Sequence, residues 1–249
     1  IEYGTVTDPL ATDRSSAHDR IISTDGNRAV GDVIDQFIPQ GLQAWGICFD
    51  GTYLYVTDPF GSSNGNIIHQ MNTDGTMTGY TINADYGGSW IGDMSSDGTY
   101  IYACNVGGDD AIKIIDIASG DLVNTISGAW TYTSQRGLGH DEINDEFYIG
   151  GWNSNNIWRV DNTGATIDQH GENGVSGLAY VDNSASDPVN EYDINNGWLL
   201  LQNFTIPSGA GGSGAGMGLN SDGNLWIVNQ SNNVVYLVET DEPLNVNNG

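Results

Sequence analysis

The feature that most constrains the fold of this chain is a short phrase that recurs along it. Residues 50–58 read Asp-Gly-Thr-Tyr-Leu-Tyr-Val-Thr-Asp and residues 97–105 read Asp-Gly-Thr-Tyr-Ile-Tyr-Ala-Cys-Asn, with five of nine positions identical at an offset of 47 residues. Related phrases follow at 147–151, 198–202 and 225–229. A fixed period of roughly 20–50 residues is typical of repeat architectures, in which each unit needs its neighbours to bury a core.

The copies of the phrase stand in similar surroundings. A short run that opens with Gly precedes most of them, and an Asn/Gly/Ser-rich loop follows. An alternating strand comes next, then a turn of the Asp-Gly kind and a further strand. These runs are short, rich in β-branched and aromatic residues, and no window of roughly 11 residues has a helical period. Four short antiparallel strands in each repeat predict an all-β fold, a single β-propeller of four-stranded antiparallel blades. The alternating strands are expected at 66–71, 111–116, 156–161 and 234–238.

The residues at 55–58, Tyr-Val-Thr-Asp, and their copies resemble the YVTN and NHL-like repeats of secreted bacterial and archaeal propellers. The resemblance extends over about residues 40–240. It implies the propeller fold and says little about activity, because such propellers serve both as binding scaffolds and as enzymes.

The number of blades is less constrained than the fold. The five copies of the phrase, together with Val-Thr-Asp-Pro at 6–9, which resembles residues 56–59, favour six blades, and five is the alternative. The step from Trp198 to Leu225 is only 27 residues, which predicts one degenerate blade around 175–215. The propeller is expected to span 1–243, with N-terminal strands within 20–39 closing the ring against the last blade. Residues 244–249 are expected to be a tail or linker.

Charge and hydropathy narrow the classes of partner. The chain of 249 residues has 6 Lys and Arg against 32 Asp and Glu, a formal net charge of −26. Such a field repels nucleic acid and anionic membrane surfaces. No apolar run approaches the roughly 18 residues of a spanning helix, so membrane insertion is not expected. The acid excess and the scarcity of lysine favour an extracellular or cell-surface location. The start at Ile1, with no leader, is expected for a chain whose signal peptide is removed or for a fragment of a longer protein.

Two cysteines, Cys48 and Cys104, lie in apolar strand-like runs. This position favours small buried thiols. A disulfide is the alternative, and it requires Cα atoms within about 7 Å, which the sequence does not determine.

Ligand-binding candidates come from the loops that enter each first strand and those that follow each second strand. In a propeller these two sets of loops share one face, at the mouth of the central channel. Four of the seven tryptophans fall in them, which favours an aromatic surface that stacks sugars or clasps a peptide. The alternative is that these tryptophans wedge between blades, and core packing is expected for Trp158, Trp198 and Trp226. The candidates are Trp45, Phe60, Trp90, Asn105, Trp130, Tyr132, Arg136 and Trp152.

Metal and catalytic signals are weak. Asp58, Asp109 and Asp110 are candidate calcium ligands because calcium prefers oxygen donors, but no Asp-x-Asp-x-Asp-Gly loop accompanies them, and turn acids that cap the backbone are the competing interpretation. The densest titratable cluster, at 140–142 (His-Asp-Glu), is expected at an exposed strand edge. No catalytic residue is assigned, and no cofactor is expected beyond that calcium candidate.

Two classes of function follow. The favoured one is a secreted, non-catalytic propeller that binds a glycan, a peptide or a neighbouring protein domain, including other domains of the same polypeptide, through its loop face. The alternative is a propeller lyase or hydrolase that acts on an extracellular polymer with acids and His140 at the channel mouth.

Overall fold

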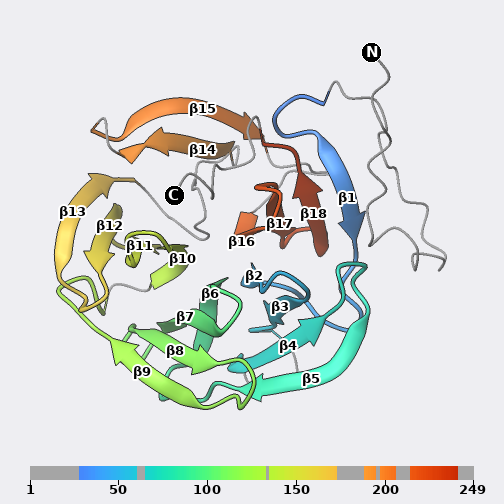
Figure 1. The fold of residues 1–249 in the computed structure, drawn as a ribbon, viewed down its shortest axis with the longest axis horizontal. Coiled ribbons are helices and arrows are strands. Elements are labelled where there is room, and N and C mark those ends of the chain that lie inside the picture. Colours follow the sequence, from blue (N-terminus) through green and yellow to red (C-terminus); the bar gives the residue numbers. More distant parts are fainter. Residues whose placement is uncertain are drawn as a thin grey trace.

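The computed structural model describes residues 28–60, 65–132, 135–172, 188–194, 197–205 and 214–240. Within these ranges the chain forms strands joined by turns, and no helix there is long and apolar enough to cross a membrane. The strands build five antiparallel sheets arranged in a ring (Figure 1). The all-β propeller predicted from the repeat is therefore confirmed.

Four of the sheets have four strands each. Three of them follow the chain from the centre of the ring outward. The first comprises β2 (Ile47–Phe49), β3 (Leu54–Thr57), β4 (Ile67–Met71) and β5 (Met77–Asn83). The second comprises β6 (Trp90–Ser96), β7 (Tyr100–Val106), β8 (Ile112–Asp116) and β9 (Leu122–Ile126). The third comprises β10 (Gln135–Asp141), β11 (Glu146–Gly151), β12 (Asn156–Asp161) and β13 (Thr166–Gly171).

The fourth sheet joins the two ends of the described chain. Its order is β1 (Val33–Phe37), β18 (Val234–Val238), β17 (Leu225–Asn229) and β16 (Gly214–Leu219). β1 pairs antiparallel with β18, from Val33 opposite Val238 to Phe37 opposite Val235. The N-terminal strand thus supplies the outer strand that the C-terminal repeat lacks, and residues 20–24, also proposed for this closure, lie outside the described residues.

A fifth sheet has two described strands, β14 (Pro188–Asp193) and β15 (Leu199–Thr205). It lies between the third and fourth sheets, because Trp198 packs with Ile157 of β12 while Val189 packs with Met217 of β16. The described strands therefore give five sheets, the alternative number, and no sixth is found in the described ranges. The small sheet falls where the degenerate blade was expected.

The recurring phrase folds into the hairpin between the first and second strands of a sheet. The Oδ1 atom of Asp50 accepts hydrogen bonds from the amides of Thr52 and Tyr53 at 2.7 and 2.6 Å, and its Oδ2 accepts one from the Tyr55 hydroxyl at 2.9 Å. Gly51 has a φ of 96°, a conformation that side chains with a Cβ rarely adopt. The Asp-Gly-Thr-Tyr phrase is thus a turn motif with a tyrosine lock.

The second copy repeats this arrangement. Asp97 accepts hydrogen bonds from the amides of Thr99 and Tyr100 at 2.8 and 2.7 Å and from the Tyr102 hydroxyl at 2.8 Å. The sequence identity between the two copies therefore reflects one local hydrogen-bond pattern that both turns require.

The innermost strands β2, β6, β10 and β16 meet at the axis of the ring (Figure 1). Glycine permits their close approach: a Cβ on Gly216 would lie 2.6 Å from the Cα of Gly46, and one on Gly46 would lie 2.6 Å from the carbonyl oxygen of Gly92. Fully buried Asp93, on β6, accepts hydrogen bonds from the amides of Ile47 and Leu138 at 3.4 Å each. Backbone contact and one carboxylate therefore hold three neighbouring inner strands together.

Apolar side chains fill the space between neighbouring sheets. Trp130, Tyr55 and Phe147 are the largest fully buried side chains. Each such burial contributes about 1.5–3 kcal/mol. The three tryptophans predicted for the core, Trp158, Trp198 and Trp226, are buried as expected. Both cysteines, at positions 48 and 104, are buried free thiols rather than a disulfide, and burial raises the pKa of each thiol.

Candidate functional site

The loops that enter the first strands and those that follow the second strands lie on one face of the ring. The amide of Gln43 donates to the Asp58 carboxylate at 3.2 Å, and the Asn66 side-chain amide donates to the Gly88 carbonyl at 3.3 Å. These bonds join loops of the two kinds, as the propeller register predicts. We call this surface the loop face. It is formed by the described residues of 38–46, 58–66, 84–90, 105–111, 127–136, 152–155 and 230–233.

Three aromatic rings lie in a row on the loop face. The Trp45 ring centroid is 5.4 Å from that of Phe60 and 5.3 Å from that of Trp90, both in edge-on contact. Phe60 is 59% exposed and Trp90 is half-buried, whereas Trp45 is 5% exposed and packs into the core beneath. Trp45 therefore anchors the row, and its two neighbours present apolar surface to solvent.

Arg136 extends this row. Its guanidinium carbon lies 5.4 Å from the Trp90 ring centroid and 4.8 Å from that of Trp152, which is 38% exposed. A β-bulge between Gln135 and Gly137 places Arg136 outside the regular pairing of β10 with β11. Bulges commonly redirect a side chain in this way. We refer to Phe60, Trp45, Trp90, Arg136 and Trp152 together as the aromatic strip.

The surroundings of Arg136 are apolar rather than acidic. Burial lowers the pKa of its guanidinium from the ordinary value, and the group stays charged near neutral pH because arginine titrates so high. Indole faces attract such a cation through the ring quadrupole, by about 0.5–2 kcal/mol per contact. The arrangement thus holds a positive charge on the loop face of a strongly acidic protein.

The three remaining ligand-binding candidates, Trp130, Tyr132 and Asn105, are not part of the aromatic strip. Trp130 is fully buried, and its Nε1 donates to the Gly164 carbonyl at 3.0 Å, so it acts as a wedge between the second and third sheets. Tyr132 is 74% exposed. Asn105 is buried, and its side-chain amide donates to Asp109 at 2.9 Å. The structure therefore brings together five of the eight predicted ligand-binding residues.

The three candidate calcium ligands each have a local partner. Asp58 accepts hydrogen bonds from backbone amides in its own and the neighbouring loop, and Asp110 accepts one from the Gly107 amide at 2.6 Å. Asp109 forms an ion pair with the nearly buried ammonium of Lys113 at 2.6 Å. Burial alone would raise the pKa of Asp109. The hydrogen bonds from Lys113 and Asn105 lower this pKa by more than burial raises it, so the net pKa shift is downward. Within the described residues no group of three metal-ligating side chains comes together.

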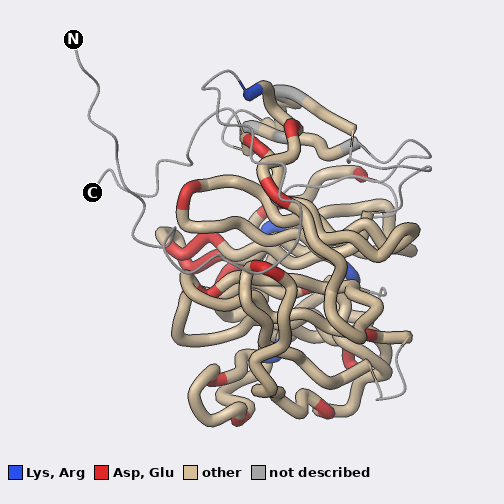
Figure 2. Tube along the Cα trace, turned by 90° about the vertical axis from the view of Figure 1, so that its right-hand side faces the viewer, with Lys and Arg blue, Asp and Glu red and all other residues tan. Residues whose placement is uncertain are grey.

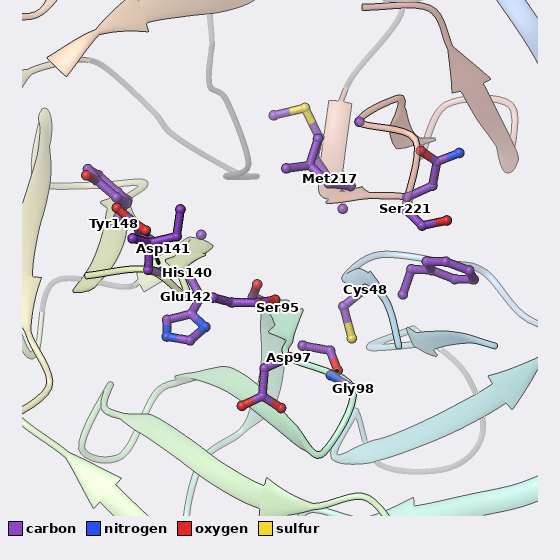
Figure 3. Close-up of a pocket in the computed structure, with 18 of the residues that line it drawn as sticks. Cys48, Ser95, Asp97, Gly98, His140, Asp141, Glu142, Tyr148, Met217 and Ser221 are labelled. Atoms are coloured by element: carbon purple, nitrogen blue, oxygen red, sulfur yellow. Dashed lines mark hydrogen bonds between the residues drawn. The ribbon is translucent and has the colours of Figure 1, made fainter. Parts of the chain in front are cut away.

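A cavity of about 530 Å³ opens at the opposite end of the channel, among the hairpin turns. We call this the turn end. Its lining includes acids, small polar residues and large apolar residues, but no Lys or Arg among the described residues. Figure 3 shows His140, Ser95 and Asp97 along one side, and Met217 and Ser221 on the other. Its acids are Asp50, Asp97, Asp141 and Glu142.

Most of these charged groups are already engaged in holding turns. Asp50 and Asp97 are the turn acids of the recurring phrase. Burial alone would raise the pKa of Asp97. The hydrogen bonds from the amides of Tyr100 and Thr99 and from the Tyr102 hydroxyl lower this pKa by more than burial raises it, so the net pKa shift is downward. Asp141 accepts hydrogen bonds from the amides of its own turn. These carboxylates therefore accept hydrogen bonds within their own hairpin turns and stabilise those turns.

His140 was expected at an exposed edge, and its side chain is instead 4% exposed. Its ring stacks on Phe147 at 4.6 Å and lies 4.3 Å from the Tyr102 ring, while its Nε2 is 3.4 Å from Asp145. The sequence does not reveal this burial, because Tyr102 comes from the neighbouring sheet. The only local signal was the strand alternation that places His140 opposite Phe147.

Comparison with known proteins supports the assignment of the propeller fold. No known protein family and no curated protein matches the sequence. The structure is similar to the crystal structure of Myxococcus xanthus glutaminyl cyclase, with a TM-score of 0.62 at 11% identity, over 84% of this chain and 95% of the other. It is more distantly similar to virginiamycin B lyase from Staphylococcus aureus, with a TM-score of 0.48 at 14% identity, over 79% of this chain and 66% of that one. At such identity the likeness to the cyclase shows the propeller fold and not the activity.

Proposed function

We propose that this chain is an extracellular, non-catalytic propeller that binds a glycan through its loop face. The observation that carries the proposal is the aromatic strip, in which rings from three sheets form one surface. Phe60 and Trp152 are the exposed ends of that surface. Aromatic anchors of this kind, with an apolar face and a polar edge, dominate the energetics of most recognition surfaces.

Other features support the proposal indirectly. The net charge of −26 disfavours nucleic acid and anionic lipid as partners. The acid excess, the single lysine and the resemblance to the repeats of secreted YVTN and NHL-like propellers favour an extracellular or cell-surface location. Figure 2 shows acidic residues spread over the turns on the side of the ring in view, with few basic ones among them. Peptides and neighbouring protein domains are the competing ligands for the same strip.

The test compares truncations at the two ends of the channel. Trp152→Ala and Phe60→Ala remove exposed rings from the strip, and Ile143→Ala removes an exposed apolar residue at the turn end. Binding to an array of glycans and peptides should fall at least about tenfold in the first two variants, the loss expected for an anchor residue. It should be unchanged in the third. Loss only in Ile143→Ala would contradict the proposal.

A second candidate function comes from the cavity at the turn end. Its volume of about 530 Å³ and its four carboxylates suit a small ligand or one unit of a polymer, which favours a lyase or hydrolase. In this case His140→Asn and Glu142→Gln should abolish the release of reducing ends from an extracellular polysaccharide. Wild-type protein that releases none, while the strip variants change binding, would leave the binding function standing alone.

A further inference from the structure

We propose that the loop face recognises a carboxylate with Arg136, and that the ligand is a linear glycan carrying uronic acid residues. This inference rests on the proposed binding function and adds the chemical class of the ligand. Its first premise is that Arg136 differs from the other described basic side chains in its ion pairing.

Arg136 differs from the other described basic side chains. Three of the four form ion pairs, Arg28 with Glu239, Lys113 with Asp109 and Arg159 with Glu146. The side chain of Arg136 forms no ion pair and no hydrogen bond with the residues that the structure describes. In a chain with 32 acids and 6 bases, an arginine without an ion pair to any described acid is the unexpected arrangement, because acids far outnumber bases.

The neighbours of Arg136 leave its hydrogen-bonding capacity unused. Trp90 and Trp152 offer their π-faces to the charge, but an indole has no acceptor for an N–H group. The Nε–H of Arg136 is buried and has no partner among the described residues. A guanidinium carries five such donors, and leaving buried ones unsatisfied costs free energy. A ligand that supplies acceptors at this point would remove that cost.

A carboxylate fits these donors better than other anions. The guanidinium is planar, and a carboxylate pairs with it through two parallel hydrogen bonds in the same plane. A phosphate group carries more negative charge than a carboxylate, and the field of the whole protein, with a formal net charge of −26, repels it more strongly.

The remainder of the aromatic strip favours a glycan over an acidic peptide. From Arg136 the strip continues through half-buried Trp90 to exposed Phe60, and buried Trp45 supports both rings in edge-on contact, at centroid distances of 5.3 and 5.4 Å. The exposed surfaces of Trp152, Trp90 and Phe60 can stack the C–H faces of sugars along a linear polymer. A uronic acid places its carboxylate directly on the sugar ring, so stacking and ion pairing occur on the same unit.

The experiment compares matched oligosaccharides by calorimetry. The probes are an otherwise neutral 1,4-linked hexasaccharide that carries one galacturonic acid unit, the same hexasaccharide with that carboxyl methyl-esterified, and a peptide with one acidic residue. Wild-type protein should bind the acid at least about tenfold more tightly than the ester, since a charge-assisted bidentate pair is lost on esterification. Arg136→Gln should remove that difference, and Trp152→Ala should weaken binding of both hexasaccharides alike.

The control variant is Arg159→Gln, which removes one positive charge from the opposite part of the third sheet. It should leave the preference for the acid unchanged. Arg136→Lys keeps the charge between the indoles but loses the planar fork, so it should fold normally and lose most of the preference. This second variant keeps the test valid if Arg136→Gln does not fold.

The outcomes separate the inference from the proposed function. Equal binding of acid and ester by the wild-type protein would overturn the carboxylate inference and leave glycan binding intact. Binding of the acidic peptide alone would overturn the glycan assignment and leave the loop face as a binding surface. Loss of the preference in Arg159→Gln would show an effect of overall charge and would also overturn the role of Arg136.

Discussion

The charged groups at the two ends of the central channel differ in whether they have hydrogen-bond partners within the protein. At the turn end the carboxylates are numerous, yet Asp50 and Asp97 are engaged by the amides and tyrosine hydroxyls of their own hairpins. On the loop face Arg136 contacts two indoles and forms no ion pair with the part of the chain that the structure describes. The comparison teaches that the number of titratable groups is a poor guide to a site, and that unsatisfied hydrogen-bonding capacity is a better one.

The largest effect on stability is expected for Asp93, which lies on an inner strand between the loop face and the turn end. Asp93→Ala removes the buried carboxylate that accepts hydrogen bonds from the amides of Ile47 and Leu138. We expect the free energy of unfolding to fall by about 3 kcal/mol, because buried donors lose their acceptor. Denaturant unfolding measures it, with the exposed Asp85→Ala as the control. A loss no greater than that of the control would show that this carboxylate does not bind the inner strands together.

The next effect distinguishes the two cations near the loop face. Lys113→Met breaks a nearly buried ion pair and leaves the half-exposed Asp109 with the Asn105 side chain and the Ala111 backbone amide, which should cost about 2 kcal/mol of stability. Among the described residues Arg136→Gln loses two cation–π contacts but also removes a buried donor without a partner, so it should cost less, about 1 kcal/mol. Chemical denaturation of the two variants side by side tests the contrast. Equal losses would mean that Arg136 is a structural cation like Lys113.

A smaller effect is expected from the tyrosine lock at the turn end. Tyr102→Phe deletes the hydroxyl that donates to Asp97, at a cost of about 1 kcal/mol near neutral pH. The net pKa shift of Asp97 is downward, so its ionised form stabilises the fold above the unfolded-state pKa near 4. That stability is lost as the pH falls through the lower folded-state pKa. The difference between variant and wild type should therefore shrink when unfolding is measured at successively lower pH, and ligand binding should not change.

The smallest effect concerns the whole acidic surface. Self-repulsion at a net charge of −26 should weaken the fold at low salt. Added NaCl screens it, with a Debye length of about 10 Å at 0.1 M. The melting temperature should rise by a few degrees between low and moderate salt. A flat response would indicate that the turn acids are already balanced by their local hydrogen bonds, which would strengthen the contrast with Arg136.

The fold was predictable because one turn motif recurs with its hydrogen bonds intact. Asp50 and Asp97 each need a Gly, a small polar residue and a tyrosine at fixed offsets, so the physical requirement is visible in the letters. The number of blades was harder to predict. The run that begins at Trp198 resembles the second-strand phrase but forms a strand paired with β14 in a sheet with only two described strands.

The candidate site was predictable only in part. The repeat register placed Trp90, Trp152 and Arg136 on one face, and the structure brings them into contact. The sequence could not distinguish exposed Trp152 from buried Trp130, because the difference depends on the neighbouring sheet that covers the ring. The bulge at Arg136 and the burial of His140 likewise depend on pairing and on contacts between sheets.

The closure of the ring by β1 also determines how this molecule responds to a pulling force. Val33 and Val238 form the last pair of the β1–β18 ladder, and the chain leaves both strands at that same end. A force applied through the two flanking segments therefore opens the ladder one pair at a time, as in a zipper, instead of shearing all its hydrogen bonds together. The Arg28–Glu239 ion pair and the Gly31–Glu239 backbone hydrogen bond lie at the first point to bear the load. In a chain pulled from both ends we expect the ring to open first at this seam, at low force, while the other sheets remain folded.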